Sequence, residues 1–335
     1  QIKDIFSFGG DFKFGRDWYQ HGHGFVMHNY MDAVNYTKRC GDVDVAFNVF
    51  FDRDNSAYVE RNGNEVAGNS DYYNIWNINA DYSTKGHDLY LGIYFNDKVG
   101  GVFSNDGADW AKENNQQLRV EFGSSGKLSN NNEKVKYDLG LVYSSTENTT
   151  VDRNGNSDDE SGILGHIAVK YDDQKQLKAK LAYTWADDEV RANIGDSVEN
   201  SNRYHDGDET IFEDIYLAGM ALGNENFRFY NLSDIKLELG YTLKDNDKHS
   251  FRLAYDHIAN DDDQKGNTFA DKAARVNAKA NYTKDLEANI ITFEYTYKLA
   301  ENTRLRLGFQ NSKIEAKNMP DIKTNLYYTE IYSRF

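Results

Sequence analysis

The feature that most constrains this chain is a period-two alternation of apolar and polar side chains along nearly its whole length. Valine and phenylalanine occupy positions 43, 45, 47 and 49, whereas Asp44 and Asn48 lie between them. The same alternation returns in residues 135–143, 177–185 and 235–243. Successive side chains of a strand point to opposite faces, so the pattern predicts strands with one apolar and one polar face. No helical pattern of ten or more residues is evident, and we expect an all-β protein.

A soluble β-sandwich would show the same apolar–polar alternation, so the residue types on the two faces are needed to distinguish it from a membrane protein. The polar face repeatedly carries Lys, Arg, Asp and Glu, and the apolar face often ends in Tyr or Trp. The chain is 14% aromatic although its mean hydropathy is −0.78, and it holds a single proline, Pro320. Lipid outside, water inside and aromatic belts at the two interfaces require this combination. It predicts a transmembrane antiparallel β-barrel as the single domain of residues 1–335.

Charge and cysteine content exclude several classes of protein. The formal net charge is −16, and nucleic-acid binding needs a basic face, so we expect no nucleic-acid partner. The single cysteine, Cys40, excludes a disulfide within the chain and a cysteine-based zinc site. No apolar run approaches the roughly 20 residues of a membrane-spanning helix. The first residues lack a basic segment leading into an apolar core, so we expect a mature or truncated product.

The alternating segments predict about sixteen strands, an even number that puts both termini on the periplasmic side. The expected strand centres are near residues 10, 30, 47, 77, 92, 119, 139, 167, 181, 217, 239, 254, 279, 293, 308 and 329. Short connections are expected at 38–42, 83–87, 172–176 and 298–303, and long ones at 52–72, 96–116, 145–161 and 187–210. This rhythm is typical of short periplasmic turns and long extracellular loops. One exception follows from the count: residues 258–273 become a long periplasmic connection and residues 244–248 a short outer one.

The carboxyl-terminal residues carry a resemblance to known proteins. The chain ends YYTEIYSRF, in which Tyr327, Thr329, Ile331 and Phe335 alternate with other residues. This resembles the last strand of bacterial outer-membrane proteins, whose final aromatic residue is part of the signal read by the barrel-assembly machinery. Tyr327, Ile331 and Phe335 are the residues expected to carry that signal. The strand count and loop rhythm resemble the general porin family of the bacterial outer membrane.

A further resemblance is to the barrel part of the OmpM-type porins of diderm Firmicutes, in which a peptidoglycan-binding domain and a stalk precede the barrel. That resemblance implies a longer protein that tethers the outer membrane to the cell wall. The general porin resemblance implies a homotrimer, although the sequence itself does not show one.

The long connection at residues 96–116 is the candidate pore constriction. In porins the third loop commonly folds into the barrel, and the resemblance implies the same here. Gly100 and Gly101 permit tight bending. The residues expected to anchor the loop and supply its carboxylates are Phe103, Trp110, Asp106, Asp109 and Glu113.

Basic residues on the lumen-facing phase of the strands would oppose those carboxylates. These candidates are Lys13, Arg119, Lys178, Lys180, Arg252, Arg304 and Arg306. Carboxylates on one side of a narrow lumen and cations on the other create a transverse field that filters solutes by charge. For any one of these residues, a hydrated charge without a filtering role remains the alternative.

Other polar clusters carry weaker expectations. The acidic outer loops could bind divalent cations that bridge to lipopolysaccharide, or they could simply be solvated loops. Two histidines, His21 and His23, lack carboxylate support in the sequence and make a poor metal site, so we expect no metal. No nucleophile motif or phosphate-binding glycine loop is present, and we expect no catalytic residues.

The sequence therefore predicts a porin: an outer-membrane channel for passive diffusion of ions and small polar solutes, with no cofactor. The acidic balance of the loops and lumen predicts a mild preference for cations. The alternatives are a barrel enzyme or adhesin that uses the strands as a scaffold, and a soluble β-sandwich or solenoid.

Overall fold

The structure is a computed structural model, and only part of the chain is described. The described residues are 2–3, 9–53, 58–59, 65–66, 72–96, 117–129, 132–151, 157–187, 190, 211, 214–215, 217–218, 231–244, 246–260, 285–315 and 321–333. Contacts divide the chain into two compact units, which are described separately. Unit 1 comprises Gln1–Thr84, Asp88–Phe122 and Val142–Gly162. Unit 2 comprises Lys85–His87, Gly123–Leu141 and Ile163–Phe335.

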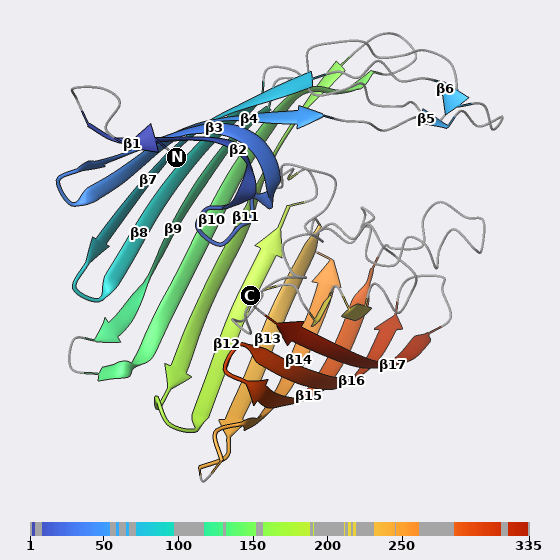
Figure 1. The fold of residues 1–335 in the computed structure, drawn as a ribbon. Helices are drawn as coiled ribbons and strands as arrows, with labels where there is room; N and C mark the ends of the chain where they lie inside the picture. The colour runs from blue at the N-terminus through green and yellow to red at the C-terminus, as the bar shows by residue number, and fades with distance from the viewer. Residues whose placement is uncertain are drawn as a thin grey trace. The chain divides into compact units, whose positions relative to one another are not determined.

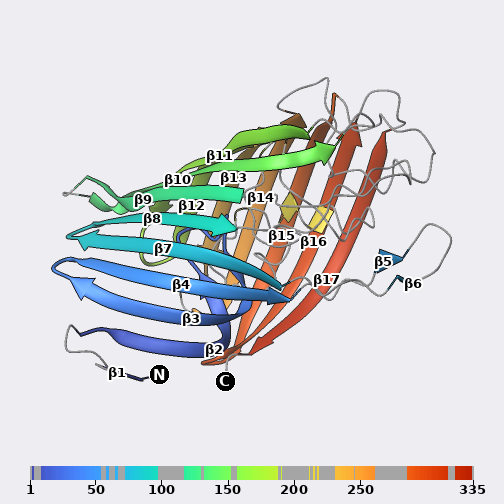
Figure 2. The same ribbon diagram turned by 90° about the horizontal axis from the view of Figure 1, so that it is seen from above.

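Unit 1 is an antiparallel sheet in chain order. Its strands are β1 (Ile2–Lys3), β2 (Asp11–Gln20), β3 (His28–Cys40), β4 (Val43–Arg53), β7 (Tyr72–Thr84), β8 (His87–Asn96) and the adjoining parts of β9 (Gln117–Ser129), β10 (Asn132–Val151) and β11 (Ser157–Asp172). Figure 2 shows β2, β3, β4 and β7 side by side. A separate short pair joins β5 (Tyr58–Val59) to β6 (Glu65–Val66).

Unit 2 continues the same pattern with the remaining parts of β9, β10 and β11. It adds β12 (Leu177–Ala186), β13 (Leu232–Thr242), β14 (His249–Asn260), β15 (Glu287–Ala300), β16 (Thr303–Glu315) and β17 (Ile322–Ser333). Each of these strands pairs antiparallel with the next, and Figure 1 shows β12 to β17 side by side. No helix in the described part of the chain is long and apolar enough to cross a membrane.

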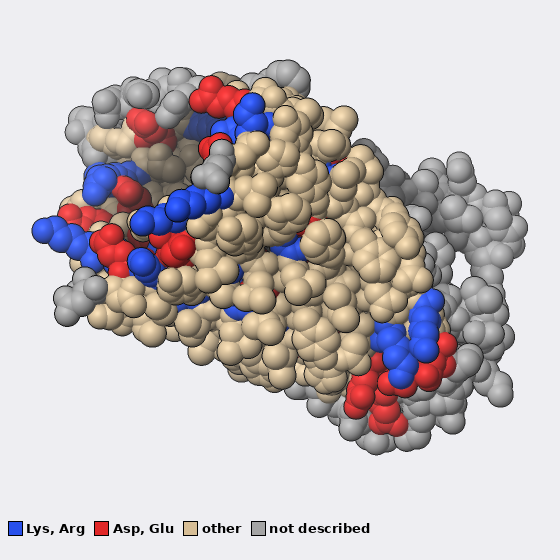
Figure 3. All heavy atoms as spheres, turned by 90° about the horizontal axis from the view of Figure 1, so that it is seen from below, with Lys and Arg blue, Asp and Glu red and all other residues tan. Residues whose placement is uncertain are grey.

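The two faces of the unit 2 sheet differ in a way that reverses the rule for soluble domains. Leu181, Leu237 and Leu253 lie on one face and are 56%, 47% and 47% exposed. On the opposite face, Lys236 and Asp256 are buried, with 2% and 0% exposed. A soluble sheet turns its apolar face inward, and contiguous exposed apolar surface marks contact with lipid or another protein. On the face drawn in Figure 3, few charged side chains reach the middle of the surface, and most gather toward its margins.

The all-β expectation is confirmed, whereas the expected count of about sixteen strands is not. Fourteen strands of ten residues or more are present among the described residues, all in one antiparallel sheet order. The strand expected near residue 217 is wrong, because Asp214, Ile215, Leu217 and Ala218 are helical. A short apolar run does not by its periodicity distinguish a strand from a buried helix. The strand expected near residue 279 lies outside the described residues.

Without a strand near residue 217, the expected exception in loop lengths, a long periplasmic connection at 258–273 and a short outer one at 244–248, is no longer needed. In unit 2 the antiparallel order puts the short turns after β11, β13 and β15 at one end of the sheet. Residues 243–248 therefore belong with the other short turns and do not form an outer connection between longer ones. The connection expected at 145–161 is also shorter than predicted, because β10 extends to Val151 and β11 begins at Ser157.

The turn between β11 and β12 is stabilised by one carboxylate. Asp173 Oδ1 accepts backbone N–H groups of Lys175, Gln176 and Leu177 at 2.8, 2.7 and 3.0 Å. The adjoining Gln174 has a positive φ of 61°. The N–H of Gln176, followed by that of Lys175, lowers the pKa of the Asp173 carboxyl.

An Asp173→Ala variant is expected to unfold at a lower temperature than the parent at neutral pH, because three N–H groups lose their acceptor. A lowered native pKa stabilises the fold above the ordinary Asp value, and that stabilisation is lost as the pH falls through the native pKa. The difference from the parent should therefore shrink in acid. Thermal unfolding in detergent, followed by circular dichroism, measures both effects, and Asp173→Asn, which keeps an oxygen acceptor, is the control. Equal midpoints for the alanine variant and the parent at neutral pH would contradict this role.

Candidate functional site

The polar face of unit 2 brings together charged side chains from three neighbouring strands, β13, β14 and β15. Lys236 lies opposite Asp256 across β13 and β14, and Arg252 lies opposite Glu294 across β14 and β15. Their spacing follows from the period-two alternation, which puts every second residue of each strand on this face. Opposite charges directly across two strands attract one another, so the register itself pairs acids with bases.

A carboxylate from outside the sheet completes this group. Asp214 comes from the connection between β12 and β13 and is 0% exposed. Its Oδ2 lies 2.7 Å from Lys236 Nζ and 2.5 Å from Arg252 Nη2, and its Oδ1 accepts from Arg252 Nη1 at 3.1 Å. The guanidinium therefore binds the carboxylate through two nitrogens, the geometry that suits arginine. We call Asp214, Lys236, Glu238, Arg252, Asp256 and Glu294 the Asp214 cluster.

The remaining members neutralise the two bases further. Arg252 Nε donates to Glu238 Oε2 at 2.8 Å, and its Nη1 donates to Glu294 Oε2 at 3.0 Å. Lys236 Nζ lies 3.3 Å from Asp256 Oδ1. The cluster therefore holds four carboxylates against two cations, so its formal charge is negative.

The charged row continues toward the last strand. Glu294 Oε1 accepts from the Tyr328 hydroxyl and from Arg306 Nη1, the latter at 3.4 Å. Arg306 Nε lies 3.4 Å from Glu330 Oε2. Charges of both signs thus extend over five strands, from β13 to β17, on a face where a soluble sheet would carry its apolar core.

Asp214 remains ionised in this setting. Burial by itself opposes ionisation, but the charges of Arg252 and then Lys236 outweigh it and hold the pKa of Asp214 far below its usual value. The carboxylate is therefore negative at neutral pH, and its attachment to the two bases is ionic.

Unit 1 also has a segment folded against its polar face. Residues 21–27 connect β2 to β3, and Phe25, Val26 and Met27 are at most 2% exposed. His21 Nε2 lies 3.1 Å from Asp81 Oδ1 on β7, so the histidine has the carboxylate partner that the sequence did not reveal. His23 N donates to the Tyr90 hydroxyl on β8 at 3.3 Å. The connection therefore reaches past β4 to strands that are distant in the sequence.

Gly22 is required at the point where this segment meets β8. Its φ is +53°, and an added Cβ would lie 2.1 Å from Tyr90 Cε2. We expect Gly22→Ala to reduce the free energy of unfolding by about 1–3 kcal/mol, from backbone strain and the clash together. Gly41 is the matched control, because its φ is +66° and a Cβ there meets nothing within 4 Å. Equal losses for Gly22→Ala and Gly41→Ala, measured by denaturant unfolding, would refute the role of the Tyr90 contact.

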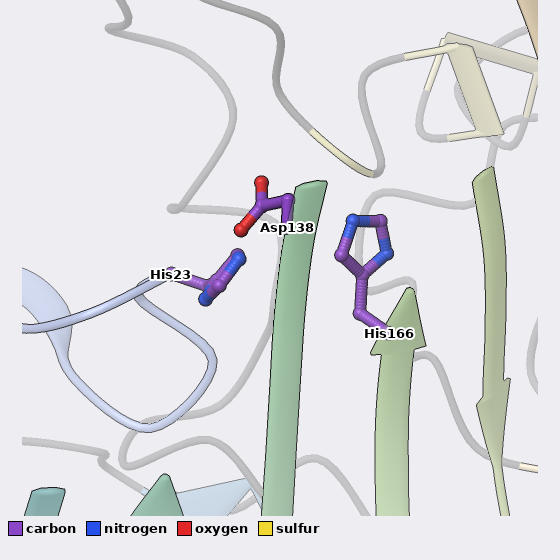
Figure 4. A group of neighbouring side chains, drawn as sticks. All are labelled: His23, Asp138 and His166. Atoms are coloured by element: carbon purple, nitrogen blue, oxygen red, sulfur yellow. The ribbon is translucent and has the colours of Figure 1, made fainter. Parts of the chain in front are cut away.

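Two further polar residues of unit 2, Asp138 on β10 and His166 on β11, are drawn in Figure 4. Asp138 Oδ2 lies 2.9 Å from Lys170 Nζ, and His166 Nδ1 lies 2.8 Å from Thr184 Oγ1. An ammonium group at this distance competes with a metal ion for the carboxylate. His23, also drawn there, belongs to unit 1 and contacts Tyr90 as described above.

The predicted basic residues fall into different surroundings. Arg252 and Arg306 belong to the charged row, and Lys180, opposite Glu238, is only 2% exposed. Arg119 is 4% exposed and donates to Gln117. The other three lie on strands: Lys13 pairs with Asp17, Lys178 Nζ lies 3.7 Å from Asp172, and Arg304 lies opposite Tyr332.

The remaining predicted residues are divided between strand β17 and the undescribed part of the chain. Tyr327 and Ile331 share one face of β17 and are 76% and 68% exposed, whereas Phe335 lies outside the described residues. The expected constriction residues Phe103, Asp106, Asp109, Trp110 and Glu113 also lie outside them. The sequence-based reasoning missed Asp214, because the apolar run at 215–222 was interpreted as a strand.

Comparisons with known proteins give a fold and no family. No family model matches the sequence, and no curated protein matches it. Among solved structures, Acinetobacter baumannii OccAB1 is similar at a TM-score of 0.55 and 11% identity, over 97% of this chain and 74% of that one. Pseudomonas aeruginosa OccK2 (OpdF) has a TM-score of 0.52 and 10% identity, over 97% and 77% of the two chains. Pseudomonas aeruginosa OccK3 (OpdO) has a TM-score of 0.51 and 11% identity, over 96% and 76%. These likenesses show that the chain has the fold of outer-membrane channels.

Proposed function

We propose that residues 1–335 form one outer-membrane domain that holds open a water-filled channel for passive diffusion of ions and small polar solutes. The observation that carries this proposal is the contrast between the two faces of the unit 2 sheet. Leu181, Leu237 and Leu253 are about half exposed on one face, whereas the opposite face bears the Asp214 cluster. Lipid is the environment that tolerates the first face, and the polar interior of a barrel is the environment that tolerates paired charges of both signs on the second.

The likeness to outer-membrane channel structures supports the same function. No catalytic role is proposed. The polar side chains of the Asp214 cluster are committed to one another by ion pairs. The finer features of the proposal are a homotrimer, lipopolysaccharide contact at the acidic loops and folding by the barrel-assembly machinery.

The filter of the proposed channel has two sides. Carboxylates of the connection at 96–116 (Asp106, Asp109 and Glu113) would face the basic wall, and the balance of charge would favour cations. The net charge of −16 supports this preference, as does the excess of carboxylates in the Asp214 cluster. A negatively charged pore raises the local concentration of cations and lowers that of anions.

Conductance in planar bilayers is the experiment that tests the channel. Purified protein added to one side of the bilayer under an applied voltage should give stepwise increases in current. Under a KCl gradient, the reversal potential should indicate a preference for potassium over chloride. Heat-denatured protein in the same detergent is the control. Absence of steps from folded protein would refute the channel, whereas steps with a reversal potential favouring chloride would refute only the cation preference.

A further inference from the structure

The described residues Ile211, Asp214, Ile215, Leu217 and Ala218 lie against the polar face of unit 2, and we call them the inner segment. They come from the connection between β12 and β13, where an exposed loop is the usual expectation. Asp214, Ile215 and Ala218 are instead 0% exposed. The short yellow pieces beside β15 and β16 in Figure 2 belong to this segment.

The inner segment is attached to the sheet in two distinct ways. The first is ionic, through the Asp214 carboxylate, which meets Lys236 at 2.7 Å and both terminal nitrogens of Arg252. The second is through the backbone, because Gln310 Nε2 donates to the Asp214 carbonyl oxygen at 2.9 Å. Gln310 Nε2 also lies 3.1 Å from Thr292 Oγ1, so the amide is held between the segment and β15. Attachment to three strands, β13, β14 and β16, fixes where the segment lies on the face.

The ionic attachment is a poor choice if stability is its only purpose. Desolvating a buried ion pair costs about as much as the charges return, and apolar replacements are often neutral or stabilising. The apolar neighbours Ile215 and Ala218 are themselves fully buried. Charged side chains differ from apolar ones in one further respect. The sum of their charges determines the sign of the local electrostatic potential.

We propose that Asp214 positions the inner segment against the lumen wall and sets the charge selectivity of the channel at that level. This rests on the proposed channel function. With Asp214 present, Lys236 and Arg252 are outnumbered by carboxylates; without its charge, the two bases are less neutralised and the cation preference weakens. The inner segment thus narrows the unit 2 side of the lumen, in addition to any constriction by residues 96–116.

Four variants separate charge from position. Asp214→Asn removes the charge and weakens the attachment, whereas Gln310→Leu weakens the attachment and leaves every charge in place. Asp214→Asn combined with Lys236→Met restores the charge balance without restoring the attachment. Asp321→Asn is the matched control, since Asp321 is an exposed acid of unit 2 whose carboxylate lies 3.6 Å from the half-buried Lys313.

Reversal potential and single-channel conductance are measured for each variant under a KCl gradient. Asp214→Asn should shift the reversal potential toward chloride and raise the conductance, and the double variant should return the reversal potential toward the parent. Gln310→Leu should raise the conductance without that shift, and Asp321→Asn should match the parent. A parent that conducts and an Asp214→Asn variant with unchanged reversal potential and conductance would overturn the proposal.

Limited trypsin digestion within residues 187–231 gives a readout that does not depend on conductance. Asp214→Asn loses charge-assisted hydrogen bonds, so a larger fraction of molecules should have the inner segment detached from the sheet. Where the cleavage rate is proportional to that fraction, trypsin should cleave this variant about tenfold faster or more. Heat-modifiable gel mobility shows that each variant is folded. A non-conducting parent overturns the channel and the selectivity role together, and unaccelerated cleavage in a conducting protein overturns the positioning role.

Discussion

Replacement of Leu237 by arginine is expected to reduce the free energy of unfolding in phospholipid vesicles by about 2–4 kcal/mol, the cost of a charge on the lipid face at the bilayer midplane. Leu237 is 47% exposed in the middle of β13. Its cross-strand neighbours Leu181 and Tyr255 lie on the same apolar face. In a membrane-spanning sheet an arginine there has only hydrocarbon around it, whereas a soluble sheet would present the same position to water.

Leu177 provides the matched control for depth. It is the first residue of β12, next to the turn at 173–176, and it is 43% exposed on the same face. Near the interface an arginine costs only about 0–1 kcal/mol, so Leu177→Arg should unfold almost as the parent does. Urea titration followed by tryptophan fluorescence measures both variants. Equal unfolding free energies for the two arginine variants, or solubility of Leu237→Arg without detergent, would argue for a soluble sheet.

The strands could be predicted from the sequence because their information is local. The expected strand centred near 239 corresponds to β13, and that near 254 to β14. The short turns expected at 38–42 and 172–176 correspond to the ends of β3 and β11. Side-chain direction depends only on the parity of position, so one-residue alternation is enough to assign each face.

The candidate site could not be predicted in the same way, because it depends on register and on long-range folding. Lys236 and Asp256 are 20 positions apart and meet only because β13 and β14 pair in one register. Asp214 reaches Arg252 from a connection whose sequence gives no period. Likewise, no pattern in residues 21–27 predicts the contact between His21 and Asp81. An apolar run followed by glycine at 215–223 was the available signal, and it fits a buried helix as well as a strand.

Replacement of Lys236 by methionine is expected to be the most damaging change on the polar face, reducing the free energy of unfolding by about 3–5 kcal/mol. Lys236 is 2% exposed, and its ammonium group lies 2.7 Å from Asp214 and 3.3 Å from Asp256. Methionine fills a similar volume but leaves those buried carboxylates without the cation. The pKa of Asp214 should rise in this variant, because one of the two bases that lower it is gone. The loss of stability should therefore diminish as the pH falls.

The same substitution at Lys178 separates a buried charge from an exposed one on the same face. The Lys178 side chain is 63% exposed, and its Nζ lies 3.7 Å from Asp172, so Lys178→Met should cost no more than about 0–1 kcal/mol. Adding Asp256→Asn to Lys236→Met should recover part of the loss, because it removes one of the carboxylates left without a cation. Urea titration of the three variants in the vesicle assay decides between two accounts of the cluster. Similar losses of unfolding free energy for Lys236→Met and Lys178→Met would mean that water screens the charges of the Asp214 cluster as fully as it screens the exposed Lys178. The ion pairs of the cluster would then not stabilise the fold. A large cost at Lys236 alone, relieved by Asp256→Asn, would show that the pairing of charges keeps the polar face in its observed arrangement.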